Sequence, residues 1–468
     1  MSENNPNFRR KPHGGPPAGP REVALQVLLR VDQEGAYSGL ELNKALEQAR
    51  LTERDKGLAT EIVYGTIQRL NTIDAALQAK VRGWPGKVEP WVKALLRLSC
   101  YQLRWLSRVP PHAVVDEAVK LAKKLGHAGV AGLVNGVLRG LLRDGFPPPP
   151  DGLPPAQRIA LLHSHPAWLV ERWIARYGED RAAALCAANN EPPRQSARVN
   201  RLKTSRDALL AAMEAAGLRA GPSRLSADGV VAEGAGNLAA TVWHRDGLLT
   251  VQDESAMLVA AVADPRPGMT AIDCCAAPGG KTTQLAERMG DRGRVVACDV
   301  HPHKERLIAR QAERLGLASV ETVVCDAREL PDRLGPASAD VVLLDAPCSG
   351  LGVIRRKPEI KWTKTPADIA ALARLQRELL GEACKLVRPG GILVYSTCTI
   401  APEENEEAAR DFLKAHPDFF PDPGWPEEVL APLRAAGALP EPFGGMVQLL
   451  PDTFGSDGFF IARFKRSL

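Results

Sequence analysis

Short apolar runs alternate with helical segments throughout residues 268–468, and this alternation constrains the fold of the chain more than any other feature. The runs cover 270–274, 294–299, 320–326, 340–345 and 391–397, with two more near 446–450 and 459–464. Apolar strands that alternate with helices predict a parallel sheet with both faces covered. Thr365-Pro366-Ala367-Asp368 has the form of a helix start, with Thr at the N-cap, Pro at the first position and an acid at the third. We therefore expect an α/β domain over residues 263–468.

Residues 21–143 show a different pattern, in which apolar residues recur at helical spacing without an alternating run between them. The pattern predicts an all-α domain of about five to seven helices. Residues 1–20, which precede it, are polar and rich in Pro, Gly and Asn. They lack the apolar core of a secretory signal, so we interpret them as a disordered tail.

Two further segments complete the predicted domain organisation. Residues 144–160 contain a run of four prolines and a later pair, and they predict a stiff linker because proline cannot continue a helix. Residues 161–262 mix predicted helices with short strands, and we interpret them as a small α+β substrate-binding module.

Charge is distributed unevenly along the chain. Residues 1–150 carry 22 Lys and Arg against 14 Asp and Glu, a net charge of +8, whereas the whole chain carries +5, which leaves −3 for the remainder. A basic N-terminal third is typical of a protein with a polyanionic partner, although a solvated basic face predicts the same composition. No apolar run approaches the length of a membrane span, so we expect no membrane partner. The nine cysteines include no C-x-x-C pair, which disfavours a zinc site and any other metal, and their odd number is typical of the reduced cytoplasm.

A glycine-rich loop follows the first predicted strand of the α/β domain, and it reads Asp273-Cys274-Cys275-Ala276-Ala277-Pro278-Gly279-Gly280-Lys281. It has neither of the glycine patterns that bind ATP or NAD phosphates. Later strands end in Asp299, Asp326 and Asp345, and Asp299 lies 20 residues past Gly279, the separation expected of an acid that binds ribose hydroxyls. S-adenosylmethionine, which has no phosphate, suits this loop. A tight β–α turn with three surface acids is the plainer interpretation.

Two cysteines stand at the ends of different predicted strands, in Asp345-Ala346-Pro347-Cys348 and in Ser396-Thr397-Cys398. A lone cysteine at a strand end is most often a small buried hydrophobe. Two of them beside a nucleotide-type pocket indicate instead a thiol that attacks an activated ring. C5 methylation of a pyrimidine in RNA is the reaction that this arrangement favours.

These segments resemble the motifs of the RNA cytosine-C5 methyltransferases. The glycine-rich loop is similar to their first motif, the segment from Asp345 to Gly352 to their fourth, and Tyr395 to Ile400 to their sixth. Three segments of the helical region resemble the NusB RNA-binding fold: 97–103, 115–119 and 133–139. A NusB-like domain followed by a methyltransferase is the layout of the Sun/RsmB family of 16S ribosomal RNA methyltransferases, and the resemblance covers nearly all of the chain beyond residue 20.

The resemblance implies a Rossmann-like, S-adenosylmethionine-dependent catalytic domain behind a NusB-like RNA-binding domain. The implied cofactor contacts are Cys275, Ala276, Ala277, Pro278, Gly279, Gly280, Lys281, Asp299, Asp326 and Asp345. Cys398 is the implied nucleophile at cytosine C6, Cys348 assists release of the adduct, and Asp345 binds cytosine N3. The implied partner is 16S ribosomal RNA, in an unassembled or partly assembled small subunit.

The loop after Cys348 is basic. Arg355, Arg356, Lys357 and Lys361 are candidate phosphate contacts, with a solvated charge run as the alternative. Trp362 suits either base stacking or core packing. Glycines in Ser349-Gly350-Leu351-Gly352 would let this loop move over RNA.

Four alternatives stay open at this point. DNA-type cytosine methylation would make Cys348 the nucleophile and leave Cys398 without a role. An N-methyltransferase would need an Asn/Asp-Pro-Pro-aromatic loop in place of 345–348. The substrate is transfer RNA in the third alternative. In the fourth the chain is a NusB-like RNA-binding assembly factor with an inert methyltransferase domain.

Overall fold

The computed structural model describes residues 19–468 and divides the chain into two compact units. One unit holds the residues up to Asn190 together with 357–363, and the other holds 191–356 and 364–468. Almost all of the predicted tail lies outside the described residues, and helix α1 already begins at Pro20. No helix within 19–468 is long and apolar enough to cross a membrane.

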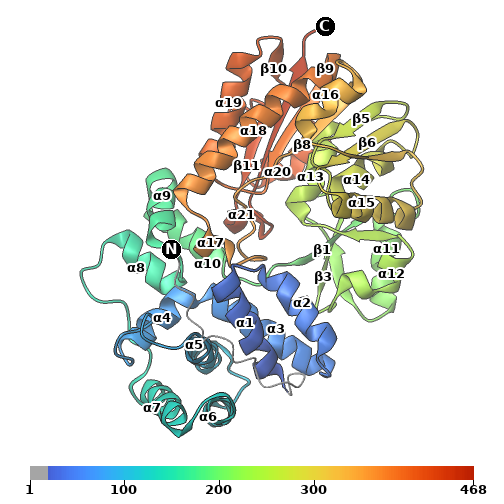
Figure 1. The fold of residues 1–468 in the computed structure, drawn as a ribbon. Coiled ribbons are helices and arrows are strands. Elements are labelled where there is room, and N and C mark those ends of the chain that lie inside the picture. Colours follow the sequence, from blue (N-terminus) through green and yellow to red (C-terminus); the bar gives the residue numbers. More distant parts are fainter. Residues whose placement is uncertain (1–18) are drawn as a thin grey trace, which may run out of the picture. The chain divides into compact units, whose positions relative to one another are not determined.

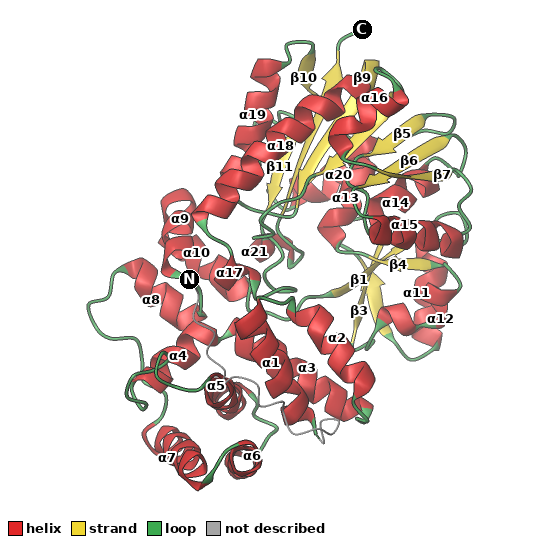
Figure 2. Ribbon diagram, in the orientation of Figure 1, coloured by secondary structure: helices red, strands yellow, loops and turns green. Residues whose placement is uncertain are grey.

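The first unit is built of helices (Figures 1 and 2). Their bounds are α1 Pro20–Glu34, α2 Ser38–Gln48, α3 Glu53–Gln68, α4 Leu70–Gln78, α5 Pro90–Trp105, α6 Pro111–Leu125, α7 Ala128–Asp144, α8 Pro155–His163, α9 Ala167–Tyr177, α10 Glu179–Ala188 and α17 Ile360–Thr363. Helix α5 is the centre of the core, with ten buried residues, and α1, α3 and α7 pack their apolar faces into the same cluster. The seven helices α1 to α7 agree with the all-α domain that the periodicity predicted.

Helices also follow the proline-rich run after α7. The segment 144–160 is helical from Pro155, because proline at the first position of a helix has no intrahelical N–H to lose. Helices α8 to α10 pack in the first unit, where Asn71 Nδ2 donates to the carbonyls of Ala160 and His165. The predicted limits of the α+β module, 161–262, stay a prediction. The other predicted domain limits stay predictions.

The segment 357–363 leaves the second unit after Arg356 and packs inside the first. Lys361 Nζ donates to the carbonyl of Gln68 at 2.9 Å, and Trp362 Nε1 donates to that of Ile67 at 2.7 Å. Lys361 is 0% exposed. The prediction that Lys361 contacts phosphate is therefore wrong, and of the two roles considered for Trp362 the structure supports core packing.

Lys361 provides a test of this packing through pH. Burial lowers the pKa of its ammonium well below the usual range, so the unfolded chain binds more protons than the folded one between the two pKa values. The free energy of unfolding must then rise with pH up to the ordinary lysine pKa of about 10.4. We expect Lys361→Met to remove that part of the slope in denaturant titrations between pH 7 and 10. Equal slopes in the two proteins would contradict the burial of the amine.

The second unit begins with a small antiparallel sheet, which forms the core of the α+β module. Its strands are β1 Gln195–Val199, β2 Arg219–Pro222, β3 Gly229–Glu233 and β4 Leu249–Val251, in the order β2-β3-β1-β4. Helix α11, Arg206–Ala215, the short α12, Val242–Arg245, and the 3₁₀ turn Leu238–Ala240 complete the module. Leu209, Met213 and Val230 form part of its core.

An eight-stranded sheet follows, and its path runs β10-β12-β9-β8-β5-β6-β7, with β11 paired to β12. Its strands are β5 Thr270–Asp273, β6 Arg294–Asp299, β7 Val320–Val324, β8 Ala339–Asp345, β9 Val387–Thr397, β10 Phe419–Pro421, β11 Met446–Leu449 and β12 Phe459–Arg466. The five strands β5 to β9 are parallel, as predicted. Strand β12 runs antiparallel to β9, and β10 and β11 each pair antiparallel with β12, so the sheet is mixed. The connection from β11 to β12 is too short for a parallel crossover, so these two strands must pair antiparallel.

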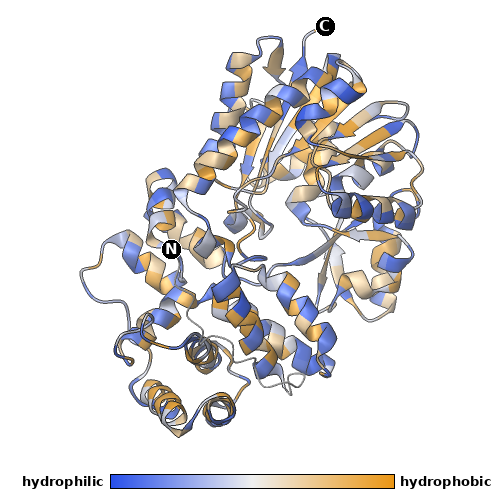
Figure 3. Ribbon diagram, viewed as in Figure 1, coloured by the Kyte–Doolittle hydropathy of each residue, from blue (hydrophilic) through white to orange (hydrophobic). Residues whose placement is uncertain are grey.

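Helices cover both faces of this sheet, and the strand residues alternate between the two cores. Val341 and Leu343 pack with helices α13 Glu254–Ala263, α14 Gly280–Arg288, α15 Pro302–Leu315 and α20 Glu427–Ala435. Val342 and Leu344 pack with α16 Leu330–Leu334, α18 Pro366–Leu386 and α19 Glu406–Ala415. The central strands are mostly orange in Figure 3, as expected for strands buried on both faces. Helix α18 begins with the predicted capping box of Thr365 and Asp368.

Candidate active site

The parallel pairing of β8 with β9 brings the two loop cysteines together. Asp345, the last residue of β8, lies opposite Ser396 of β9, so both strands end at the same edge of the sheet. The loops that follow place Cys348 Sγ 3.3 Å from Cys398 Sγ. Hydrogen bonding to Cys398 and burial together raise the pKa of Cys348 well above its usual range. Cys348 is therefore held as a thiol that can donate a proton toward the other sulfur.

The glycine-rich loop reaches the same edge from β5. Gly279 has φ +104°, a backbone conformation that favours glycine, and a Cβ there would also make a tight contact of 3.2 Å with Ile308 Cα. Lys281, in the first turn of α14, bonds Asp345 Oδ2 at 2.6 Å, and Ser396 Oγ bonds Asp345 Oδ1 at 2.8 Å. The loops after β5, β8 and β9 thus meet at Asp345.

Burial alone would lower the pKa of Lys281, but the charge and hydrogen bond of Asp345 outweigh it, with a smaller contribution from Cys398, and the pKa is raised. Lys281 is therefore a cation that is paired with Asp345 and also interacts electrostatically with Cys398. Asp273 ends β5 at the start of this loop, and burial raises the pKa of its carboxyl to about 6. Its Oδ2 accepts from Thr282 Oγ1, whereas its Oδ1 is buried without a hydrogen-bond partner.

The other two predicted cofactor acids lie in different surroundings. Asp299 ends β6, is 8% exposed, and accepts from the backbone N–H of His301 at 3.0 Å. Asp326 follows β7, caps the 3₁₀ turn Ala327–Glu329 and pairs with Arg328, which lowers the pKa of its carboxyl. Asp299 is thus the more enclosed of the two.

Glu404 and Asn405 hydrogen-bond the two cysteine loops, and neither is among the site residues predicted from the sequence. Glu404, which is 0% exposed, accepts from the backbone N–H of Ser349 at 2.8 Å and from Gln376 Nε2 at 3.0 Å. Asn405 donates to the carbonyl of Thr399 at 3.0 Å. In the sequence both residues lie within the polar run from Glu403 to Glu407, so no local signal distinguished them. Their burial in the structure shows that they serve a hydrogen-bond network.

The loop after Cys348 is held against its neighbours rather than being free to move. A Cβ on Gly352 would lie 2.0 Å from the carbonyl oxygen of Gly458 and 2.8 Å from that of Cys398. Gly352 also exchanges backbone hydrogen bonds with both residues, at 2.8 and 3.0 Å. The glycine at 352 serves this close backbone approach, and our expectation that the glycines give the loop mobility is wrong for this position.

The arginines that follow are largely structural. Arg355, which is 6% exposed, donates to the carbonyls of Gly455 and Pro451, so its predicted phosphate contact is wrong. Arg356 bridges Asp253 and Asp457 at 2.8 and 2.7 Å. Burial and the charge of Asp253 raise the pKa of Asp457 to about 7 in spite of this arginine.

Within residues 19–468, no group of three or more His, Cys, Asp or Glu side chains is placed to hold a metal ion. The nine cysteines all lie in this range, and none of them forms a disulfide.

Three known protein families match successive parts of the chain, in agreement with the fold. Residues 260–465 match the model of the 16S rRNA methyltransferases RsmB/F, 18–143 match the NusB family, and 165–239 match the ferredoxin-like domain of RsmF/B-like methyltransferases. The last match includes α9 and α10, which pack in the first unit of the structure. A fold with these three parts and a loop edge of this kind defines a methyltransferase with an attached NusB-type domain.

Relatives of similar length identify the family of methyltransferases to which the chain belongs. The chain is 43% identical over 451 residues to the "Probable ribosomal RNA small subunit methyltransferase B" of Bacillus subtilis, covering 95% of this chain and 98% of the relative. It is 37% identical to the ribosomal RNA small subunit methyltransferase B of Sodalis glossinidius, covering 95% and 96%. The crystal structure of PH0851 superposes with a TM-score of 0.79 at 28% identity over 97% of this chain and 100% of that one. NSun6 from Pyrococcus horikoshii, solved with SFG, has a TM-score of 0.58 at 25% identity over 66% of this chain and 100% of that one. The chain belongs to the RsmB/F, or Sun, family of 16S rRNA methyltransferases, which confirms the resemblance stated above.

Gly352→Ala tests the contact between the loops. The added Cβ would overlap the carbonyl oxygen of Gly458, so the backbone must shift, and we expect a loss of about 1–3 kcal/mol in the free energy of unfolding. Gly136→Ala in helix α7 is the control, because its Cβ would meet no atom within 4 Å and alanine favours a helix. Equal stability of the two variants in denaturant titrations would refute the close contact.

Proposed function

We propose that the protein transfers a methyl group from S-adenosylmethionine to C5 of a cytosine in 16S ribosomal RNA, through a covalent adduct on cysteine. The observation that supports this most is the pair of sulfurs 3.3 Å apart, beside the Lys281–Asp345 ion pair at the carboxyl edge of a parallel sheet. Ligands of open α/β sheets bind at this edge. The chain's family membership supports the same class of reaction.

The residues at this edge suit the cofactor. Asp273 Oδ1 is buried without a partner, and Gly279 brings the backbone close to a ligand without an intervening side chain. Cys275 to Lys281 would then line the cofactor, Asp299 would bind the ribose hydroxyls, and Asp326 and Asp345 would border it. Bound S-adenosylmethionine would supply an electrophilic methyl group to a carbon nucleophile. NSun6, similar in fold, was solved with SFG, an analogue of this cofactor, which supports the assignment.

Cytosine C5 is a poor nucleophile, and a cysteine can change that. In the proposed reaction the thiolate of Cys398 adds to C6, and the electron pair of the C5–C6 bond moves to C5. C5 then takes the methyl group from the sulfonium of S-adenosylmethionine, whose S–CH3 bond breaks to leave S-adenosylhomocysteine. The proton that leaves the Cys398 thiol passes to the Asp345 carboxylate, which then donates a hydrogen bond to cytosine N3 as the adduct forms. The nearby ammonium of Lys281 interacts favourably with the thiolate.

Cys348 must first lose its thiol proton to solvent, and its raised pKa then makes the thiolate basic enough to remove the C5 proton. The electron pair of that C–H bond restores the C5–C6 double bond, and the C6–S bond breaks, which releases the methylated base and the Cys398 thiolate.

The position of Cys398 in the site also constrains the kind of RNA that can serve as substrate. A cytosine must leave any base stack before Cys398 can reach C6, which favours a loop or a single-stranded segment of RNA. We propose 16S RNA of an unassembled or partly assembled small subunit, bound in part by the basic NusB-like helices. Bisulfite sequencing of ribosomal and transfer RNA from a deletion strain tests this. Loss of methylation in transfer RNA alone would favour the transfer RNA alternative, and no loss anywhere would favour an inert methyltransferase domain.

Asp299→Ala tests the cofactor assignment. If Asp299 binds the ribose hydroxyls, we expect S-adenosylmethionine to bind more weakly by about 1–3 kcal/mol. Calorimetry on the folded variant measures this, with Asp326→Ala as a comparison at the more exposed acid. Wild-type affinity in Asp299→Ala would remove Asp299 from the site.

The two cysteines should fail in different ways when each is replaced. We expect Cys398→Ala to be inactive and to form no covalent complex, because the step that activates C5 is lost. Cys348→Ala should attack and transfer methyl, then stall with RNA attached. A slowly migrating protein–RNA band on a denaturing gel should therefore appear with Cys348→Ala and be absent with Cys398→Ala. The reverse pattern would identify Cys348 as the nucleophile, and full activity of both variants would leave both thiols structural.

A further inference from the structure

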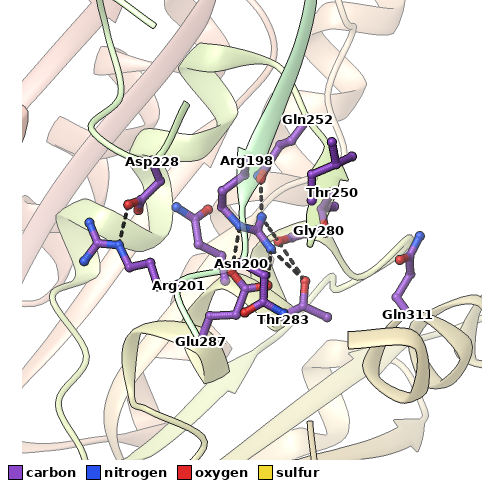
Figure 4. A network of polar contacts seen from close by, with 12 residues as sticks. Arg198, Asn200, Arg201, Asp228, Thr250, Gln252, Gly280, Thr283, Glu287 and Gln311 are labelled. Atoms are coloured by element: carbon purple, nitrogen blue, oxygen red, sulfur yellow. Dashed lines mark hydrogen bonds and ion pairs between the residues drawn. The ribbon is translucent and has the colours of Figure 1, made fainter. Parts of the chain in front are cut away.

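A buried arginine of the α+β module contacts the loop that we assign to the cofactor. Arg198, in strand β1, is 1% exposed (Figure 4). Its Nε and Nη2 bond both carboxylate oxygens of Glu287 in α14, at 3.1 and 2.9 Å. Nη2 also donates to Thr283 Oγ1 at 3.1 Å, while Nη1 donates to the carbonyl of Gly280 at 2.8 Å and to Gln252 Oε1. All five N–H groups of the guanidinium thus have partners.

The position of these partners along α14 is informative. Gly280 is the first residue of the helix and directly follows Gly279, whereas Glu287 lies two turns further on. An arginine that only joined two domains would need no bond to the first turn. The bond to Gly280 instead restrains the backbone at the point where the loop turns into the helix, and Gln252 restrains the arginine from the module's side.

A second arginine connects the module to the helix behind Asp299. Arg314, in the last turn of α15, donates to the carbonyls of His244 and Leu249 at 2.6 and 3.0 Å and to Thr250 Oγ1 at 3.2 Å. Helix α15 follows the loop that carries Asp299, and α14 follows the loop that carries Gly279. The module therefore holds the helices behind both of the loops that we assign to the cofactor.

We propose that the α+β module braces the cofactor loops, with Arg198 as the positioning residue, so that the module sets the affinity for the nucleoside cofactor independently of its contacts with RNA. This rests on the proposed function in one respect, that the loop from Cys275 to Lys281 binds S-adenosylmethionine. It adds to the substrate-binding role that we predicted for the module.

The test must separate positioning from stability. Removing Arg198 alone would leave the carboxylate of Glu287 buried and unpaired, which is strongly destabilising, whereas replacing both members of a buried ion pair by apolar residues of similar size often preserves stability. The variant is therefore Arg198→Met with Glu287→Leu, made in the full chain. Arg245→Ala is the matched control, because that arginine lies in the same module, is 75% exposed and pairs with its neighbour Asp246.

Calorimetry with S-adenosylmethionine and steady-state kinetics on unmodified 16S RNA provide the measurements. We expect the double variant to bind the cofactor about tenfold or more weakly, the size of effect that loss of a charge-assisted hydrogen bond produces, and its KM for the cofactor to rise in proportion. Its kcat at saturating cofactor and its affinity for RNA should stay within about threefold of the wild-type values. Arg198→Lys, which keeps the charge but presents only three donors, should give an intermediate cofactor affinity.

Each possible result either supports or overturns the proposal that Arg198 positions the cofactor loop. A folded double variant with wild-type cofactor affinity overturns the proposal, as does a fall in kcat with an unchanged KM for the cofactor, because that is the result of a purely structural role. If the double variant does not fold, Arg198→Lys decides instead, and wild-type cofactor affinity in that variant overturns the proposal. Failure of the wild-type protein to bind S-adenosylmethionine would refute the proposed function rather than the bracing.

Discussion

The parallel pairing of β8 with β9 is the constraint on which the rest of the site depends. It places Asp345 opposite Ser396, and the two following loops then bring Cys348 and Cys398 within 3.3 Å of each other. The strands are buried on both faces, so their register is set by two cores at once. A shift of one residue would exchange the side chains of the two faces. The chemistry at the loop ends is therefore held in place by the hydrophobic packing beneath it.

Hydrogen bonds between buried polar groups fix the positions of the two cysteine loops, which apolar packing alone does not do. Glu404 holds the Cys348 loop through Ser349, and Asn405 holds the Cys398 loop through Thr399. The backbone of Gly352 also packs directly against that of Gly458, with no room for a side chain between them. Because the dielectric constant inside a protein is low, such fully buried bonds are costly to break, and together they favour a single arrangement of the loops. The bonds of Lys281 and Ser396 to Asp345 connect this arrangement to the glycine-rich loop.

The path of the chain between the two units bears on how the protein can be dissected. After the loop of Cys348 the chain enters the first unit at residue 357, where Lys361 and Trp362 bond the carbonyls at the end of α3, and it returns to the second unit at residue 364. Removal of the NusB-like helices would thus expose side chains that belong to the segment just beyond that loop. RNA affinity of the helices is better tested by surface substitutions in the full chain than by truncation.

The sequence by itself determined the local features. Apolar runs predicted the five parallel strands, helical spacing predicted α1 to α7, and Thr365 with Asp368 predicted the start of α18, because these depend on neighbours along the chain. Motif resemblance identified the family and the candidate residues from Cys275 to Cys398. The tertiary structure decided what depends on distant partners: the antiparallel direction of β12, the packing of α8 to α10 in the first unit, and the burial of Arg355 and Lys361. The identity of a lysine or arginine in the sequence does not show whether it lies on the surface or in the core. Only the residues that fold around it, such as Gln68 around Lys361 or Glu287 around Arg198, determine whether its charge meets solvent or holds the protein together.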